Sequence, residues 1–271
     1  FLAKDTTLHL VCVGRNIINK HCSNTRIKYF KWDFRSFKQS NLLFLKKANI
    51  VINCVGKNDG DLYNLKDVNV TFVKKLLQYI NNYNFNLRLV HLSSVAVYET
   101  TKNYFGNYKL ISENSQTMTN NFYSKSKLEG DLLIQNNIKR NFNNNFSFTI
   151  LRISNVFGGS KKSNLYKFIM FSLKFRFWIK YSDDIIFNFI NVKDVAQAVR
   201  LTILKLRVSK NKIYIVSDDC KQKGIYKNYE NLYKKKIFKI NVSKNVIKFL
   251  IYFLPFSKKI LNFITLISAR V

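Results

Sequence analysis

Proline and glycine are scarce in this sequence, with one Pro and eight Gly in 271 residues. This scarcity excludes collagen-like chains and Pro-rich linker proteins. Because 47% of the residues are hydrophobic and only 23% are charged, an intrinsically disordered chain is excluded as well. A chain of this length suits one large domain or one domain with a small lobe. We therefore expect a globular protein with a full hydrophobic core.

Cysteine and histidine are few and scattered, and no two cysteines have the CxxC spacing. The positions are Cys12, Cys22, Cys54, Cys220, His9, His21 and His91. This distribution argues against a disulfide framework and against a zinc site. We expect no bound metal and a reducing compartment, the cytoplasm.

Long hydrophobic runs are absent too. The longest uncharged stretches, 249–257 and 260–269, are well short of the ~20 residues that span a bilayer. Lys4 and Asp5 interrupt the apolar start, so no signal peptide is predicted. Residues 245–267 have a composition compatible with an interfacial membrane helix, but the favoured interpretation is a pair of helices packed on a substrate-side lobe.

Acidic residues are outnumbered, with 15 Asp and Glu against 46 Lys and Arg, which gives a net charge of +31. Such a charge alone indicates nucleic acid or an anionic surface. Lysine far outnumbers arginine, however, and uncharged Asn, Ile, Phe and Tyr are all abundant, so a composition bias explains the charge better. The lysines are also spread along the chain. We expect no specific nucleic-acid partner.

Apolar runs alternate with helical patterns over the first 160 residues. Strands are predicted at 8–13, 27–30, 50–55, 87–93 and 146–153, and helices at 36–47, 65–83 and 121–140. This order predicts an α/β fold with a doubly wound parallel sheet, Rossmann-like, over residues 1–160. A helix at 165–179, a strand at 187–192, a helix at 195–206, a strand at 213–216 and a Lys-rich amphipathic end predict a smaller substrate-binding lobe over 161–271.

Polar residues that suit proton transfer follow the fourth predicted strand and open the next helix. Ser94 lies just after the strand, and Tyr123 and Lys127 are four residues apart, hence on one helix face. A nearby ammonium favours the phenolate and lowers the pKa of a tyrosine, which makes a usable proton shuttle. A YxxxK pair alone also occurs by chance in a chain rich in Tyr and Lys.

The order of motifs resembles the extended short-chain dehydrogenase/reductase family, the NAD(P)-dependent epimerases and dehydratases that act on nucleotide sugars. The resemblance covers about residues 8–199. The matching segments are KWDF at 31–34, VINCVG at 51–56, SSVAVY at 93–98, YSKSKLEGD at 123–131, LRISNVFG at 151–158 and FINVKDVA at 189–196.

The resemblance implies a role for each matching residue. The catalytic residues would be Ser94, Tyr123 and Lys127, with Ser94, Val95 and Asn155 also facing the sugar nucleotide. The NAD or NADP cofactor would be held by Arg15, Asp33, Phe34, Asn53, Cys54, Val55, Tyr123, Lys127 and Ile153. Other interpretations are a loop cap for Ser94, a turn residue for Asn155 and helix caps for Asp33 and Asp194, the last favoured over a ligand.

Several departures from the family pattern are visible. No Gly-rich turn for a pyrophosphate is present. The sequence starts with Phe1 and ends without a turn signal, so we expect truncation at both ends, the turn upstream of Phe1, and poor cofactor binding and no activity in residues 1–271 alone. Phe72 and Val73 stand where relatives often carry Gly and Thr, which puts close helix packing there in doubt.

Two further positions refine the expected reaction. Arg15 stands where NAD-preferring relatives place an acid, which favours NADP over NAD. Val95 and Ala96 replace the acidic pair of sugar-nucleotide dehydratases, which disfavours a 4,6-dehydratase. The sequence thus predicts an NAD(P)-dependent epimerase or 4-keto reductase of a nucleoside-diphosphate sugar in polysaccharide supply, with homodimerisation implied by the resemblance. The alternative is a catalytically silent member of the same fold that binds RNA or another polyanion.

Overall fold

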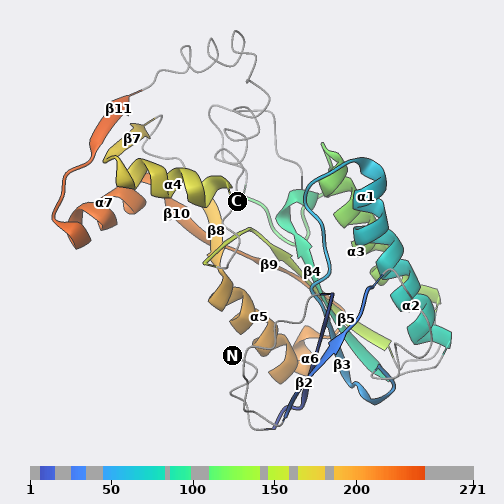
Figure 1. Ribbon diagram of the computed structural model, residues 1–271. Helices are drawn as coiled ribbons and strands as arrows, with labels where there is room; N and C mark the ends of the chain where they lie inside the picture. Colours follow the sequence, from blue (N-terminus) through green and yellow to red (C-terminus); the bar gives the residue numbers. More distant parts are fainter. Residues whose placement is uncertain are drawn as a thin grey trace. The chain divides into compact units, whose positions relative to one another are not determined.

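The computed structural model describes residues 7–15, 26–34, 45–82, 86–98, 110–140, 146–158, 164–180 and 186–241 (Figure 1). The chain divides into two compact units, each described here by itself. The first unit comprises Phe1–Val97, Thr117–Arg152 and Lys193–Ile215, and the second comprises Tyr98–Gln116, Ile153–Val192 and Val216–Val271. The boundary at residue 160 between a cofactor domain and a substrate lobe stays a prediction. The predicted helices after residue 241, and most of the one predicted at 36–47, lie outside the described residues.

The first unit is built on parallel strands. A four-stranded sheet has the order β3-β4-β5-β9, where β3 is Ile50–Asn53, β4 is Leu87–Ser94, β5 is Phe146–Ile153 and β9 is Lys212–Val216. β3 and β4 pair in parallel, with Asn53 opposite His91. β1 (Leu10–Gly14) and β2 (Ile27–Lys31) form a separate parallel pair among the described residues. The predicted α/β class with a parallel sheet is confirmed.

Helices of the first unit follow the predicted segments closely. The helix predicted at 65–83 is α1 (Leu62–Lys66), the π-helical segment η3 (Asp67–Thr71) and α2 (Phe72–Asn82) in succession. Asp61 caps its start, because its carboxylate accepts a hydrogen bond of 2.7 Å from the Asn64 backbone. The helix predicted at 121–140 is α3 (Phe122–Arg140). The described part of this unit also contains the 3-10 turn η4 (Val95–Val97), α5 (Val192–Leu204) and α6 (Leu206–Ser209).

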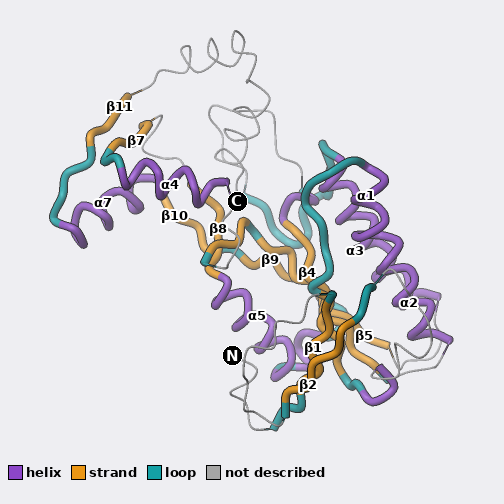
Figure 2. Tube along the Cα trace, viewed as in Figure 1, coloured by secondary structure: helices purple, strands orange, loops and turns teal. Residues whose placement is uncertain are grey.

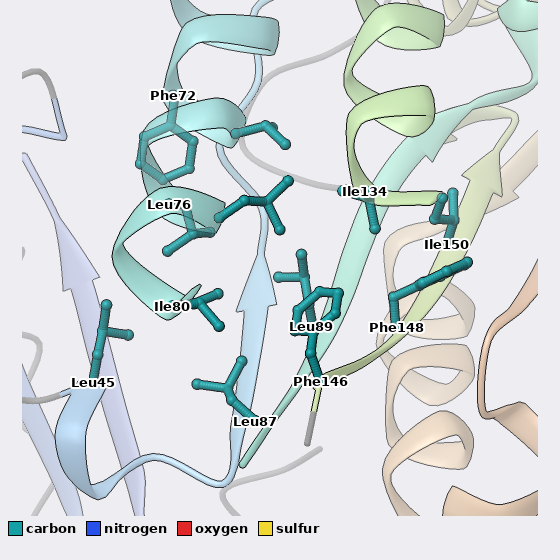
Figure 3. Close-up of a cluster of buried hydrophobic side chains, with 12 residues drawn as sticks. Leu45, Phe72, Leu76, Ile80, Leu87, Leu89, Ile134, Phe146, Phe148 and Ile150 are labelled. Atoms are coloured by element: carbon teal, nitrogen blue, oxygen red, sulfur yellow. The ribbon is translucent and has the colours of Figure 1, made fainter. Parts of the chain in front are cut away.

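The main core lies between the sheet and the helices α2 and α3 (Figure 3). Strand side chains alternate between two faces, so Leu87 and Leu89 point into this core while Arg88 points away. On the opposite face the Arg88 guanidinium donates to the Leu206 carbonyl at 2.7 Å and to Thr149 and Ser209 at 2.8 Å each. Figure 1 accordingly shows α2 and α3 on one side of the sheet and α5 and α6 on the other.

Where the structure describes it, the second unit contains both parallel and antiparallel strand pairs together with the helices α4 and α7 (Figure 2). The strands β6 (Asn155–Phe157), β8 (Ile186–Asn191) and β10 (Asp218–Lys221) pair in the order β10-β8-β6, antiparallel for β10-β8 and parallel for β6-β8. β7 (Phe177–Lys180) and β11 (Phe238–Asn241) pair in parallel. The helices are α4 (Asn164–Lys174) and α7 (Gln222–Tyr233). Trp178, Phe187, Tyr226 and Ile237 form the core of this unit.

The prediction of one helix over 165–179 is wrong for its last third, residues 175–179. α4 ends at Lys174, and Phe177–Lys180 is the strand β7. Arg176 adopts a left-handed backbone with φ of 54°, which stops the helix. The aromatic and β-branched residues that follow suit a strand.

Non-glycine residues occupy other left-handed positions as well. Asn211 has φ of 56° and Lys234, at the C-cap of α7, has φ of 54°. Among glycines in the described residues, Gly60 and Gly158 have positive φ. None of the helices within the described ranges is long and apolar enough to cross a membrane.

Candidate active site

The first unit brings the ends of β3 and β4 together with one turn of α3. Lys127 is 5% exposed, and its ammonium donates a hydrogen bond of 2.8 Å to the carbonyl oxygen of Leu92 in β4. The same ammonium lies 3.6 Å from the point that a Cβ on Gly56 would occupy, just past β3. The carboxyl ends of parallel strands are where ligands bind in such sheets. The geometry therefore gathers Ser94, Tyr123 and Lys127 at this edge.

Tyr123 and Ser94 interact through their hydroxyl groups. Burial raises the pKa of Tyr123 above its ordinary value, and the Ser94 hydrogen bond acts in the opposite direction. The sequence led us to expect that Lys127 lowers this pKa. In the structure the Lys127 ammonium is engaged with Leu92, and burial sets the direction of the shift.

Lys127 itself is an ammonium in a dry environment. Burial lowers its pKa, while the Asp131 carboxylate and Cys54 raise it. Burial raises the pKa of the Cys54 thiol, predicted at the cofactor side of β3, and the Lys127 charge acts in the opposite direction. Asp131 follows Lys127 by one helical turn and partly offsets the cost of burying the ammonium.

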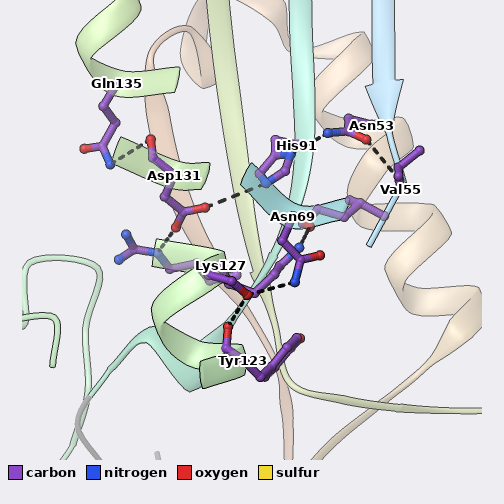
Figure 4. Close-up of polar contacts among 11 residues, drawn as sticks. Asn53, Val55, Asn69, His91, Tyr123, Lys127, Asp131 and Gln135 are labelled. Atoms are coloured by element: carbon purple, nitrogen blue, oxygen red, sulfur yellow. Dashed lines mark hydrogen bonds and ion pairs between the residues drawn. The ribbon is translucent and has the colours of Figure 1, made fainter. Parts of the chain in front are cut away.

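A buried polar cluster lies behind Lys127, and the sequence analysis missed it (Figure 4). Asp131 accepts a hydrogen bond of 3.0 Å from Arg152 Nε, and its other oxygen lies 3.8 Å from His91 Nε2. Asp131, Arg152 and His91 are each 2% exposed or less. Burial raises the pKa of Asp131, and Arg152 opposes that shift. An acid four residues after the lysine was the available signal, because i and i+4 share a helix face.

Asn69 was also missed. From η3 its amide bonds both backbone groups of Lys57, accepting at 2.9 Å and donating at 2.8 Å, and it donates to Ser126 Oγ at 2.9 Å. The turn after β3 is therefore fixed to α3 through one buried side chain. A buried Asn within a helix bonds outward only when other elements supply partners, which a local pattern does not reveal.

Residues predicted at the adenosine end form a second cluster. The Arg15 guanidinium, after β1, lies 4.9 Å from the ring centre of Phe34, after β2. Phe34 in turn contacts the ring of Phe72 at 5.6 Å, and Asp33 is its neighbour in the chain. A cation and an aromatic face at two adjacent strand ends suit an adenosine and its phosphate.

Two predicted residues are assigned to the second unit. Ile153 is buried at the end of β5. The Asn155 amide in β6 donates to the carbonyl of Asn188 at 3.2 Å. Their predicted contacts with cofactor and sugar nucleotide stay predictions. Within the described part of the chain, no group of three or more His, Cys, Asp or Glu is arranged to hold a metal ion.

No curated protein matches the chain. It is similar to the UDP-glucuronic acid 4-epimerase from Bacillus cereus in complex with NAD, at 14% identity over 89% of this chain and 81% of that one, with a TM-score of 0.70. It is also similar to the UDP-Glc/GlcNAc 4-epimerase from Campylobacter jejuni, at 16% identity over 87% and 79%, with a TM-score of 0.69.

A third similar structure is the dTDP-glucose 4,6-dehydratase from Bacillus anthracis in complex with NAD, at 15% identity over 86% and 75%, with a TM-score of 0.66. At such identities these structures show a shared Rossmann-like fold. The model of the NAD dependent epimerase/dehydratase family matches residues 7–217, more than half of the chain. The chain therefore belongs to the NAD-dependent epimerase/dehydratase family.

Proposed function

We propose that the protein is an NAD(P)-dependent epimerase or 4-keto reductase of a nucleoside-diphosphate sugar. The observation that carries the proposal is the convergence of Ser94, Tyr123 and Lys127 at the ends of β3 and β4. Two similar structures are 4-epimerases of UDP-sugars, and membership of the family supports the same class of substrate here.

Each of the three side chains has a defined task. Tyr123 exchanges a proton with a hydroxyl or keto oxygen of the sugar, and Ser94 hydrogen-bonds the same oxygen. Lys127, one helical turn from Tyr123, is proposed to favour the phenolate form of that ring against the effect of burial, which raises the pKa of Tyr123. The nicotinamide, when bound, supplies or accepts the hydride. Val95 and Asn155 are proposed to contact the sugar nucleotide.

The donor groups present fit the two ends of a nicotinamide dinucleotide. Lys127, Asn53, Cys54, Val55 and Ile153 would hold the nicotinamide ribose end. Arg15, Asp33 and Phe34 would hold the adenosine end, and the Arg15 guanidinium against Phe34 supports a preference for the 2'-phosphate of NADP. No Gly-rich pyrophosphate turn occurs in the 271 residues, so we propose that they bind the cofactor weakly on their own.

Substitution of Tyr123 tests the assignment directly. Tyr123→Phe in the full-length protein should lower turnover by roughly 10²–10⁴-fold, the usual contribution of a general acid or base, while the cofactor dissociation constant stays within about threefold. Tyr63→Phe is the matched control, because Tyr63 is 81% exposed in the same unit and should leave turnover unchanged. Retained activity in Tyr123→Phe would sink the assignment.

A panel of nucleotide sugars separates the two reactions. An epimerase returns its cofactor to the starting state, so the absorbance of the reduced nicotinamide stays constant while the sugar is converted. A reductase consumes one NADPH for each keto-sugar. A 4,6-dehydratase is disfavoured because Val95 and Ala96 offer no acid for water elimination.

We also propose that the protein is cytoplasmic and forms a homodimer. Cys12, Cys54 and Cys220 are free thiols, which supports the reducing cytoplasm. A homodimer through α3 is supported by Phe122, 57% exposed, and Leu132, 45% exposed, on that helix.

A further inference from the structure

His91 lies at the centre of the buried cluster and has no task in the proposed reaction. It belongs to β4, where it pairs in register with Asn53 of the parallel strand β3. It is 1% exposed, and its two ring nitrogens face different elements of the first unit. Nδ1 lies 3.0 Å from the Asn53 amide nitrogen, and Nε2 lies 3.8 Å from the Asp131 carboxylate on α3.

The directions of the hydrogen bonds fix the proton on the ring. The backbone N–H of Val55 donates to Asn53 Oδ1 at 3.0 Å, so the other end of that amide is its NH₂ group. This NH₂ group donates to His91 Nδ1, which must therefore be the unprotonated nitrogen. The ring proton is on Nε2 and points at Asp131. At 3.8 Å this second contact is an attraction between an N–H dipole and a carboxylate, longer than a hydrogen bond.

The charges around the ring keep it neutral. Lys127 and Arg152 already place two cations beside the single carboxylate of Asp131. A protonated His91 would add a third buried cation to this group. Burial and the Lys127 charge both lower the pKa of His91 well below its ordinary value, in agreement with a neutral imidazole.

We propose that His91 is a positioning residue that holds the end of β3 and the Asp131–Lys127 turn of α3 in a fixed relation. Through Asn53 it fixes the backbone turn at Val55, and its Nε2–H dipole attracts the Asp131 carboxylate, which Arg152 holds by a hydrogen bond of 3.0 Å and which supports the Lys127 ammonium. The inference rests on the proposed function, because these two elements would hold the nicotinamide ribose from either side.

The test compares His91→Phe with His91→Gln in the full-length protein. Phenylalanine fills the space without polar atoms, whereas glutamine can still accept from Asn53 and donate to Asp131. We expect His91→Phe to raise the dissociation constant for NADH roughly tenfold, the loss of about one buried hydrogen bond, and His91→Gln to restore it to within about threefold. Because His91 does not touch the reacting atoms, kcat should change less than KM for the cofactor.

A measurement without cofactor keeps the inference falsifiable if a variant fails to fold. Long-range ¹H–¹⁵N correlation spectra of the wild-type ring should show the Nε2–H tautomer at neutral pH. An Nδ1–H tautomer or a protonated ring would overturn the inference, and so would a folded His91→Phe that binds NADH as wild type does. Wild-type protein that binds no nicotinamide cofactor would overturn the proposed function instead, which is a distinguishable result.

Discussion

Among single residues, burial of the titratable side chain of His91 makes the stability of the fold depend on pH. The pKa of His91 lies well below 6.5 in the folded chain, and the unfolded chain has the ordinary value of ~6.5. Between these two values the unfolded chain binds a proton that the folded chain does not. The free energy of unfolding is therefore unaffected by His91 above pH ~6.5 and falls by up to about 1.4 kcal/mol per pH unit below it.

Urea unfolding over roughly pH 5 to 7 measures this slope. His91→Phe should remove the part of the pH dependence that comes from protonation of this one ring, whatever the substitution does to the free energy of unfolding at neutral pH. Equal slopes in wild type and His91→Phe would contradict the prediction.

Gly130 shows how closely two helices approach. A Cβ at this position in α3 would lie 2.7 Å from the Asn69 carbonyl oxygen of η3, closer than atoms can pack. Gly130→Ala should therefore destabilise the protein by roughly 1–3 kcal/mol. Gly224→Ala is the matched control within α7, where the nearest atom, Cys220 Sγ, is at 3.4 Å and higher helix propensity should stabilise by about 1 kcal/mol. Denaturant midpoints that move in the same direction would refute this.

At the scale of elements, Phe72 explains a departure from the family pattern. Phe72 and Val73 replace the expected small residues, yet both are buried in the main core at the start of α2. The Phe72 ring contacts Trp32 at 6.0 Å and Phe34 at 5.6 Å, so it attaches the segment after β2 to the helix layer. The close approach of helices is provided instead by Gly130 of α3.

Truncation of Phe72 should be costly for this reason. Phe72→Ala should lower the free energy of unfolding by about 3–5 kcal/mol, through lost burial and the cavity left behind. Phe238→Ala is the control, because Phe238 is 72% exposed on β11 and should change stability by less than about 0.5 kcal/mol. Chemical unfolding of both variants measures these changes in the free energy of unfolding. A small effect of Phe72→Ala would show that the β1-β2 pair is not held by this ring.

Most elements of the first unit were predictable because each has a strong local signal. β3, β4 and β5 are apolar runs, and α3 begins at Asn121–Phe122 where a polar residue precedes a helical pattern. The end of α4 was not predictable, since Arg176 is not a residue that announces a left-handed turn. The π-helical segment at Asp67–Thr71 was not predicted either, because the helical spacing of the apolar residues indicated an ordinary helix there.

In the candidate site, too, the residues that follow from local sequence rules were predictable and the others were not. The gathering of Ser94, Tyr123 and Lys127 follows from two local rules, the strand-end rule and the i to i+4 rule. Asn69, His91 and Arg152 were missed because their partners come from other elements, and only the tertiary structure brings these together.

At the scale of the whole molecule, the charge of +31 leads to a test of the alternative function. If composition bias explains the lysines, an unstructured RNA should bind only at low salt and not detectably near 0.15 M, in a filter-binding or fluorescence anisotropy titration. The control is a polylysine peptide of similar charge, which should bind under the low-salt condition. Tight RNA binding at physiological salt would favour the polyanion-binding alternative over an enzyme.

In this glycine-poor chain, residues with full side chains occupy backbone positions that would suit glycine, which is useful for engineering. Arg176 and Lys234 occupy left-handed positions that a glycine would adopt without strain. The left-handed backbone of each residue destabilises the fold by about 1 kcal/mol relative to glycine, after the greater conformational freedom of glycine in the unfolded chain is subtracted. Asn211 is different, since its side chain accepts from the Phe148 backbone and justifies its place. Arg176 and Lys234 belong to the second unit, apart from Ser94, Tyr123 and Lys127. Arg176→Gly and Lys234→Gly should therefore raise the stability of the second unit without changing Ser94, Tyr123 or Lys127.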